Sequence, residues 1–248
     1  MDDLGEAERN AQERLGRMIE RVSRGEDLPD HYPYGVRALR EEIVLEIAGE
    51  GDVPPAIVTR NTYGSLVINA PAVMFVDIDV PEPGMLKRLG GLFSGASRPD
   101  SALEALKASV TTASSSSFRI YKTAGGYRLI ATERTFDPGS TEAEAVMEAV
   151  GADPAYVQLC RAQRSFRARV TPKPWRCGAT PPPNQFPRDV REQMVFEEWL
   201  TTYQQHCASR AVCRYLGETG TGRVSSAVAH VLRYHDEHTR ANSQLALA

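Results

Sequence analysis

The sequence predicts an α+β fold, and three observations support this prediction. Between residues 73 and 172, short apolar segments with a two-residue period alternate with segments of helical period. Gly125 and Gly126 join two of the strand segments, as expected for a hairpin. The helical segments follow Asp, Ser or Thr residues, which commonly cap helices. Short strands and capped helices in one stretch of chain are typical of an α+β domain.

The composition indicates a globular protein with one main core. The chain has 248 residues, of which 42% are hydrophobic and 25% charged. The net charge of −3 gives no general attraction to nucleic acid. No apolar stretch approaches the length of a membrane span, and residues 1–20 are too charged for a signal peptide. We therefore expect a cytoplasmic protein that does not enter the membrane.

The segments before residue 73 predict one helix and a small set of strands. Apolar residues recur at helical spacing over 4–24, and a strand or a helix is expected over 41–48. Strands over 56–60 and 65–69 are joined by turn residues and predict a hairpin.

The clearest strand covers residues 73–80 and ends before two prolines. The segments after it are predicted in this order: a helix over 100–110, strands over 118–123 and 127–132, helices over 140–150 and 153–163, and a strand over 166–172. This order is the ferredoxin-like split β-α-β arrangement, with the first strand at the centre of an antiparallel sheet. The N-terminal strands would extend the sheet.

A Pro-rich linker follows, with helices expected over 190–216 and 225–238. We divide the chain into an N-terminal helix and arm (1–30), an α+β core (31–178), and a linker with C-terminal helices (179–248). The terminal helices flank the core and are possible surfaces for a protein partner.

Asp77 and Asp79 are the first candidate functional residues. Period-two geometry places both carboxylates on one face of their strand. Two like charges a few ångströms apart raise one pKa or require a cation. Mg²⁺ or Mn²⁺ would meet this requirement together with substrate phosphates. The alternative is a solvent-facing strand end at which the two acids pair with arginines.

Basic residues form a second group. Arginine forks on one sheet bind phosphate well, and Phe166 and Trp175 could stack on bases. The alternative is a solvated face that neutralises nearby acids; for the hairpin residues it is a simple Gly-Gly turn. The candidate phosphate or nucleic-acid ligands are Arg119, Lys122, Thr123, Arg128, Arg167, Arg169, Lys173 and Arg176.

The Asp-x-Asp strand and the hairpin with Thr-x-x-Gly-x-(basic) resemble the palm of archaeo-eukaryotic primases and primase-polymerases. The resemblance covers residues 73–172, and Asp77 and Asp79 match the family's metal carboxylates. Arg128 stands near the position where the family has a histidine. The third carboxylate has no clear match; Asp137 and Asp236 are candidates. The resemblance implies metal-dependent nucleotidyl or phosphoryl transfer on a nucleotide or nucleic acid.

Residues 59–65 and 167–178 also resemble an uncharacterised bacterial family, and that resemblance implies no activity. Two non-enzymatic alternatives remain open: a nucleic-acid-binding module and a regulatory scaffold protein. His235 and His238 could add a metal ligand or simply end a solvated helix. The cysteines lack metal-site spacing, so we expect reduced, partly buried thiols, with a scattered zinc site using His206 as the alternative.

Overall fold

A computed structural model describes residues 41–80 and 99–248 of the chain. The chain divides into the units Met1–Val36 and Arg37–Ala248, and every described residue belongs to the second. The helix expected over 4–24 therefore lies outside the described residues. Within them, no helix has both the length and the apolar character needed to cross a bilayer.

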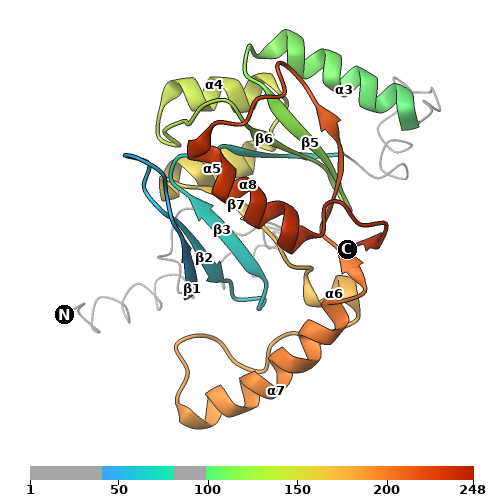
Figure 1. Ribbon diagram of the computed structural model, residues 1–248. Helices are drawn as coiled ribbons and strands as arrows, with labels where there is room; N and C mark the ends of the chain where they lie inside the picture. Colours follow the sequence, from blue (N-terminus) through green and yellow to red (C-terminus); the bar gives the residue numbers. More distant parts are fainter. Residues whose placement is uncertain (1–40, 81–98) are drawn as a thin grey trace, which may run out of the picture. The chain divides into compact units, whose positions relative to one another are not determined.

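The described residues form a mixed α+β structure, so the predicted fold class is confirmed (Figure 1). The strands are β1 (Glu42–Ile47), β2 (Ala56–Arg60), β3 (Leu66–Ala70), β4 (Phe75–Asp79), β5 (Phe118–Thr123), β6 (Gly126–Ala131), β7 (Phe166–Arg169), β8 (Arg210–Ala211), β9 (Cys213–Glu218) and β10 (Ala246–Leu247). The helices are α3 (Pro99–Ala113), α4 (Thr141–Ala149), α5 (Pro154–Gln163), α6 (Pro174–Cys177), α7 (Val190–Cys207) and α8 (Ser226–Thr239).

The strands form two antiparallel four-stranded sheets and one short parallel pair. One sheet has the order β1-β2-β3-β7, and the other has the order β4-β6-β5-β9. The parallel pair is β10 with β8. The β2–β3 and β5–β6 hairpins agree with the prediction. The N-terminal strands do not extend the sheet that contains β4, because they belong to the other sheet.

The predicted ferredoxin-like sheet is not formed as expected. That arrangement requires β7 to pair with β4, but β7 pairs with β3, and β4 is an edge strand of its sheet. The hydroxyl of Tyr156 on α5 fills the gap between the two strands. It lies 3.0 Å from the Phe75 carbonyl oxygen and 2.9 Å from that of Arg167, and it accepts from the Arg167 N–H at 3.2 Å. One side chain therefore satisfies backbone groups that a β4–β7 ladder would otherwise pair.

The helix expected over 190–216 is shorter than predicted. Asp189 and Glu192 form a reciprocal capping box that starts α7. The helix ends at Cys207, however, and the short β8 and then β9 follow. Strand β9 pairs with the edge of β5 that β6 does not occupy, with Cys213 opposite Thr123. Pairing with an available sheet edge outweighs the local helical pattern here.

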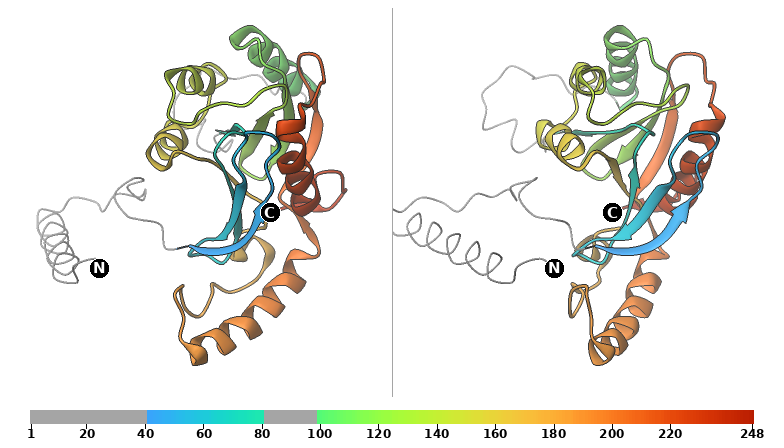
Figure 2. Two further views of the ribbon diagram at one scale, coloured as in Figure 1. Left: turned by 60° about the vertical axis from the view of Figure 1, so that its left-hand side comes forward. Right: turned by 90° about the vertical axis from the view of Figure 1, so that its left-hand side faces the viewer.

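The sheets separate two groups of helices. Figure 2 shows α4 and α5 on one side of the strands and α8 on the other. The buried residues of α8 recur at helical spacing and form one apolar stripe with a histidine and a threonine: Val228, Val231, Leu232, His235 and Thr239. The stripe places the ring centroid of His235 5.7 Å from that of Phe75 and 4.9 Å from that of Tyr121. The face of β4 that carries Phe75 is therefore the face toward α8.

Replacing Tyr156 with Phe tests whether its hydroxyl connects the two sheets. The change leaves buried backbone groups of Phe75 and Arg167 without a partner, so we expect a loss of about 1–3 kcal/mol in the free energy of unfolding. Urea denaturation measures it. Tyr234→Phe is a matched control, because its buried hydroxyl has no hydrogen-bond partner among the described residues and its removal should be neutral. Equal effects of the two changes would contradict this account.

Candidate functional site

Strand register brings the two predicted acids to one face of the β4 sheet. Asp77 lies opposite Arg128 on β6, and Asp79 lies opposite Gly126. Arg128 in turn lies opposite Tyr121 on β5. Because directly opposed residues of antiparallel strands point to the same face, Asp77, Asp79 and Arg128 share one side of the sheet.

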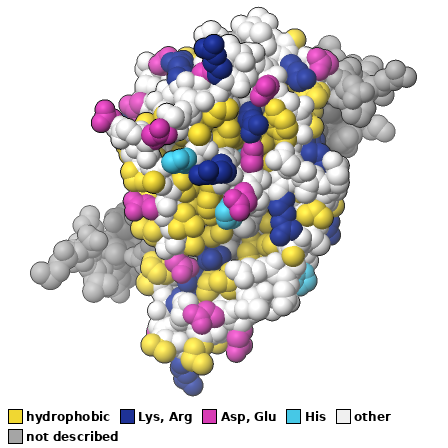
Figure 3. Space-filling model, in the orientation of Figure 1, with side chains coloured by type: hydrophobic (Ala, Val, Ile, Leu, Met, Phe, Trp, Pro, Cys, Tyr) yellow, Lys and Arg dark blue, Asp and Glu magenta, His cyan; other side chains and the backbone are white. Residues whose placement is uncertain are grey.

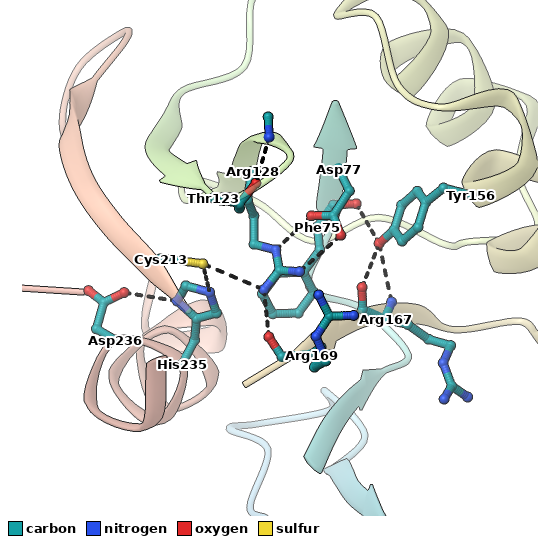
Figure 4. A network of polar contacts seen from close by, with 11 residues as sticks. Phe75, Asp77, Thr123, Arg128, Tyr156, Arg167, Arg169, Cys213, His235 and Asp236 are labelled. Carbon is teal, nitrogen blue, oxygen red and sulfur yellow. Dashed lines mark hydrogen bonds and ion pairs between the residues drawn. The ribbon is translucent and has the colours of Figure 1, made fainter. Parts of the chain in front are cut away.

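Asp77 and Arg128 form a bidentate ion pair (Figure 4). Arg128 donates from Nε to Oδ1 at 2.7 Å and from Nη2 to Oδ2 at 2.9 Å. The Arg128 side chain is only 3% exposed, whereas that of Asp77 is 35% exposed. Burial alone would lower the pKa of Arg128, but the Asp77 carboxylate outweighs it and the pKa is raised. The guanidinium therefore stays charged, and Asp77 is its counter-ion.

The ion pair continues into a buried polar network toward α8. Cys213 Sγ lies 3.8 Å from Arg128 Nη1 and 3.9 Å from His235 Nε2, and His235 Nδ1 lies 3.0 Å from Asp236 Oδ1. This Cys-His-Asp order has the connectivity of a nucleophilic triad. Both Cys213 and His235 are fully buried, however, and burial raises the pKa of the thiol to about 11. The network is therefore structural.

Arg169 lies next to this ion pair, and its side chain has no partner of its own among the described residues. Its backbone oxygen accepts from Arg128 Nη1 at 2.8 Å, but its guanidinium makes no hydrogen bond or ion pair within 41–80 and 99–248. In Figure 4 the only dashed line to Arg169 ends on its carbonyl oxygen, and none reaches its guanidinium. Burial, together with the charge of Arg128, lowers the pKa of Arg169. A half-buried guanidinium without a counter-ion in the described ranges lowers stability, and an anionic ligand would offset this loss.

Lys173 and Arg176 add positive charge beside Arg169. Burial lowers the pKa of Lys173, and the charges of Arg169 and Arg176 lower it further. Asp79 has the opposite effect on the pKa of Lys173, so the acid and the three basic groups are close enough to interact. Arg169, Lys173 and Arg176 form what we call the basic cluster.

Asp153 is a third carboxylate at this place, and the sequence interpretation identified it only as a helix start. Its N–H donates to the Asp77 carbonyl oxygen at 3.1 Å, and its side chain caps α5. Partial burial raises the pKa of Asp79, and the charges of Asp153 and then Asp77 raise it further. Asp153 therefore interacts with Asp79, whereas the side chain of the candidate Asp137 accepts from the Gly139 N–H in a turn.

Two predicted phosphate ligands are held elsewhere by carboxylates. Arg119 forms an ion pair with Asp236 at 2.7 Å, which also removes Asp236 as a metal ligand candidate. Arg167 forms an ion pair with Glu41 at 2.7 Å, with both side chains largely buried. We do not include either arginine in the candidate site.

The two hairpin residues also have other roles. Lys122 points to the opposite face of the sheet from Asp77, because it is directly opposed to Tyr127, and its Nζ lies 4.4 Å from the centroid of that ring. Thr123 Oγ1 accepts from the Gly126 N–H at 3.0 Å and stabilises the turn. The turn alternative given for this hairpin therefore accounts for both residues.

Of the two aromatic residues expected to stack on bases, only one is accessible. Phe166 is fully buried in the core, so its predicted role is wrong. Trp175 is 51% exposed and contacts Tyr63 edge-on, with ring centroids 5.3 Å apart. Lys173 Nζ lies 5.4 Å from the Trp175 ring centroid. An exposed aromatic surface therefore borders the basic cluster.

No preformed metal centre is present in the described part of the chain: no three His, Cys, Asp or Glu side chains there are arranged to hold an ion. His235 is buried, whereas His238 is exposed and stacks on Tyr234 at 3.7 Å, so the two histidines do not share a ligand site. The cysteines are free thiols, and Cys160, Cys177 and Cys213 are buried.

Comparisons with protein-family models, curated proteins and solved structures found no match to this chain. The surface in Figure 3 carries charged side chains of both signs among hydrophobic ones, with no extended basic stripe on that face. The candidate site is therefore defined by its local geometry: the basic cluster, Asp79, Asp153 and the Asp77–Arg128 ion pair.

Replacing Asp77 with Asn tests the structural role of the ion pair. The change leaves buried Arg128 without its counter-ion, and we expect a loss of about 3 kcal/mol in unfolding free energy, toward the low end for a buried pair because Asp77 is partly exposed. Adding Arg128→Met should recover most of this loss. A stability loss below about 0.5 kcal/mol in the single variant would show that Asp77 does not hold Arg128.

Proposed function

We propose that the protein binds the phosphate groups of a nucleotide or of a nucleic-acid end at the basic cluster. The observation that carries the proposal is Arg169, a half-buried arginine whose buried Nε and remaining donors have no partner among the described residues, and which lies next to two further cations. Phosphate oxygens match the forked donors of arginine and supply the missing negative charge.

The charge arrangement supports Arg169, rather than Arg128, as the phosphate ligand. Arg128 already has both Asp77 oxygens and the Arg169 carbonyl as acceptors, so its donors are largely used. The side-chain donors of Arg169 are unused within 41–80 and 99–248, and Lys173 and Arg176 can bind further phosphate oxygens. A ligand with more than one phosphate would use all three residues.

The exposed Trp175 favours a ligand that also carries a base. Stacking of a base on an aromatic ring contributes about 1–3 kcal/mol and tolerates different bases. Tyr63 supports the ring from its edge, and Lys173 lies close to it. Phosphate binding at Arg169 and base stacking on Trp175 are compatible because Lys173 interacts with both residues.

Replacing Arg169 with Met tests the proposal. We expect the affinity for pyrophosphate to fall at least about tenfold, because charge-assisted hydrogen bonds are lost. The variant should be as stable as the wild type or more stable, since an unpaired buried charge has been removed. Calorimetric titration and urea denaturation measure the two quantities.

Arg161→Met is the matched control, because Arg161 is 65% exposed and pairs with Glu144 on the surface. It should change pyrophosphate affinity less than about twofold. If both variants bind pyrophosphate as well as the wild type, or if the wild type does not bind it, the proposed function is wrong.

A second candidate function is metal-dependent nucleotidyl or phosphoryl transfer, as in a primase-like palm. The negative charges of Asp153 and Asp77 near Asp79 favour this second candidate, because a divalent cation would relieve the repulsion that raises the pKa of Asp79. Mg²⁺ commonly uses one or two protein carboxylates and completes its shell with water and substrate phosphates. Asp79 and Asp153 would hold such an ion, and it would supply charge stabilisation for the transferred phosphoryl group.

Asp79→Asn tests this candidate through its pH dependence. Because the pKa of Asp79 is raised above its ordinary value of 3.8, the folded state binds more protons than the unfolded state as the pH rises above 3.8. The contribution of Asp79 to the free energy of unfolding therefore falls as the pH rises through this range. The variant should have a Tm about 1–2 °C higher than the wild type at neutral pH, and the difference should disappear below pH 3.8.

Millimolar Mg²⁺ with pyrophosphate should raise the Tm of the wild type more than pyrophosphate alone, and should not do so for Asp79→Asn. An equal response of both proteins to Mg²⁺ would leave phosphate binding intact as the function and would reject the metal-dependent candidate.

A further inference from the structure

A pocket outside the candidate site has the properties of a second anion-binding site. It has a volume of about 470 Å³ and is lined by residues from β2 and β3, the segment after β7, and the C-terminal parts of α7 and α8. This volume falls within the range of small-molecule sites. Three arginines line it: Arg60, Arg210 and Arg240.

Two of these arginines lack a carboxylate partner. Arg60 forms an ion pair with Glu42, at 3.4 Å. Neither Arg210 nor Arg240 forms an ion pair within the described ranges, and the buried Nε of Arg210 has no hydrogen-bond partner there. Arg240 Nη1 donates to the Ala208 carbonyl oxygen, which fixes its side chain but does not neutralise it.

The other lining residues limit what the anion can be. Glu237 and His238 line the pocket as well, but both are exposed. Leu66, Leu200 and the ring of Tyr203 provide apolar surface. A ligand that fits would have one strongly anionic group for the arginines and an apolar or flat body for this surface.

We propose that this pocket binds a small organic phosphate, with Arg210 and Arg240 as the phosphate ligands. A phosphomonoester carries a charge between about −1.5 and −2 at neutral pH, which matches two guanidinium groups that form no ion pair among the described residues. Its three terminal oxygens accept hydrogen bonds from two forks at once, whereas a carboxylate offers only two oxygens. The inference uses none of the residues of the basic cluster and is independent of the function proposed above.

Isothermal titration with phenyl phosphate, which joins the anionic group to an apolar ring, tests the inference. The wild type should bind it at least about fivefold more tightly than inorganic phosphate and more tightly than benzoate. Arg210→Gln should reduce the affinity at least about tenfold, and Arg210→Lys should recover part of it. Arg161→Met, a change at a surface arginine that pairs with Glu144, should leave it unchanged. Each titration is repeated in the Arg169→Met background, which removes binding of phenyl phosphate at the basic cluster from the comparison.

A second measurement needs no variant of the pocket. In ¹³C-methyl spectra of the wild type, phenyl phosphate should shift the methyl resonances of Leu66 and Leu200, which line the pocket. The inference is overturned if these resonances do not move at saturating phenyl phosphate. It is also overturned if Arg210→Gln, shown to be folded by circular dichroism, binds phenyl phosphate as well as the wild type.

Discussion

The ion pair between Asp77 and Arg128 is the interaction on which the centre of this structure depends. Arg128 is the most deeply buried cation of the site, and it is directly opposed to Asp77 across the β4–β6 ladder. Its third donor reaches the Arg169 carbonyl oxygen on β7. One side chain therefore links β4 and β6 to β7, which belongs to the other sheet.

This link and the Tyr156 hydroxyl together replace a missing row of backbone hydrogen bonds. In a ferredoxin-like sheet, β4 and β7 would pair directly. Here Arg128 and Tyr156 connect them through side chains, and β7 is free to pair with β3. Such buried polar links must be fully satisfied, because each unpaired group would lower the stability of the folded state.

The same constraint explains why the positive charge of Arg169 is available. Asp77 forms its ion pair with Arg128, so in the part of the chain that the structure describes Arg169 lies nearby without a counter-ion of its own. Proteins seldom bury a cation in this way without a functional reason, and perturbed titratable groups gather at functional sites. The site thus consists of the Asp77–Arg128 ion pair beside Arg169, a cation without an ion-pair partner among the described residues, with Asp79 and Asp153 at its edge.

Local patterns in the sequence were sufficient to predict most elements and the shared face of Asp77 and Asp79. The hairpin at Gly125 and Gly126 and the helix after Asp153 follow from turn and capping residues, which act within a few positions of chain. The pairing of β7 with β3 could not be predicted in this way, because it joins two strands that are far apart in the sequence.

The ion-pair partners of the arginines could not be predicted from the sequence either. Arg119 and Arg167 look equivalent to Arg169 in the sequence, but they meet Asp236 and Glu41, which are 117 and 126 positions away. Only the folded chain separates paired from unpaired guanidinium groups. The proximity of Asp153 to Asp79 also follows from tertiary packing.

The central claim is that Arg169 is the unpaired cation that receives phosphate while Arg128 remains bound to Asp77. The most direct measurement is ¹⁵N NMR of the arginine Nε–Hε groups during a pyrophosphate titration. The account predicts that the Arg169 signal shifts and becomes protected from solvent exchange, whereas the Arg128 signal stays in place. A shift of Arg128 with no change at Arg169 would contradict it.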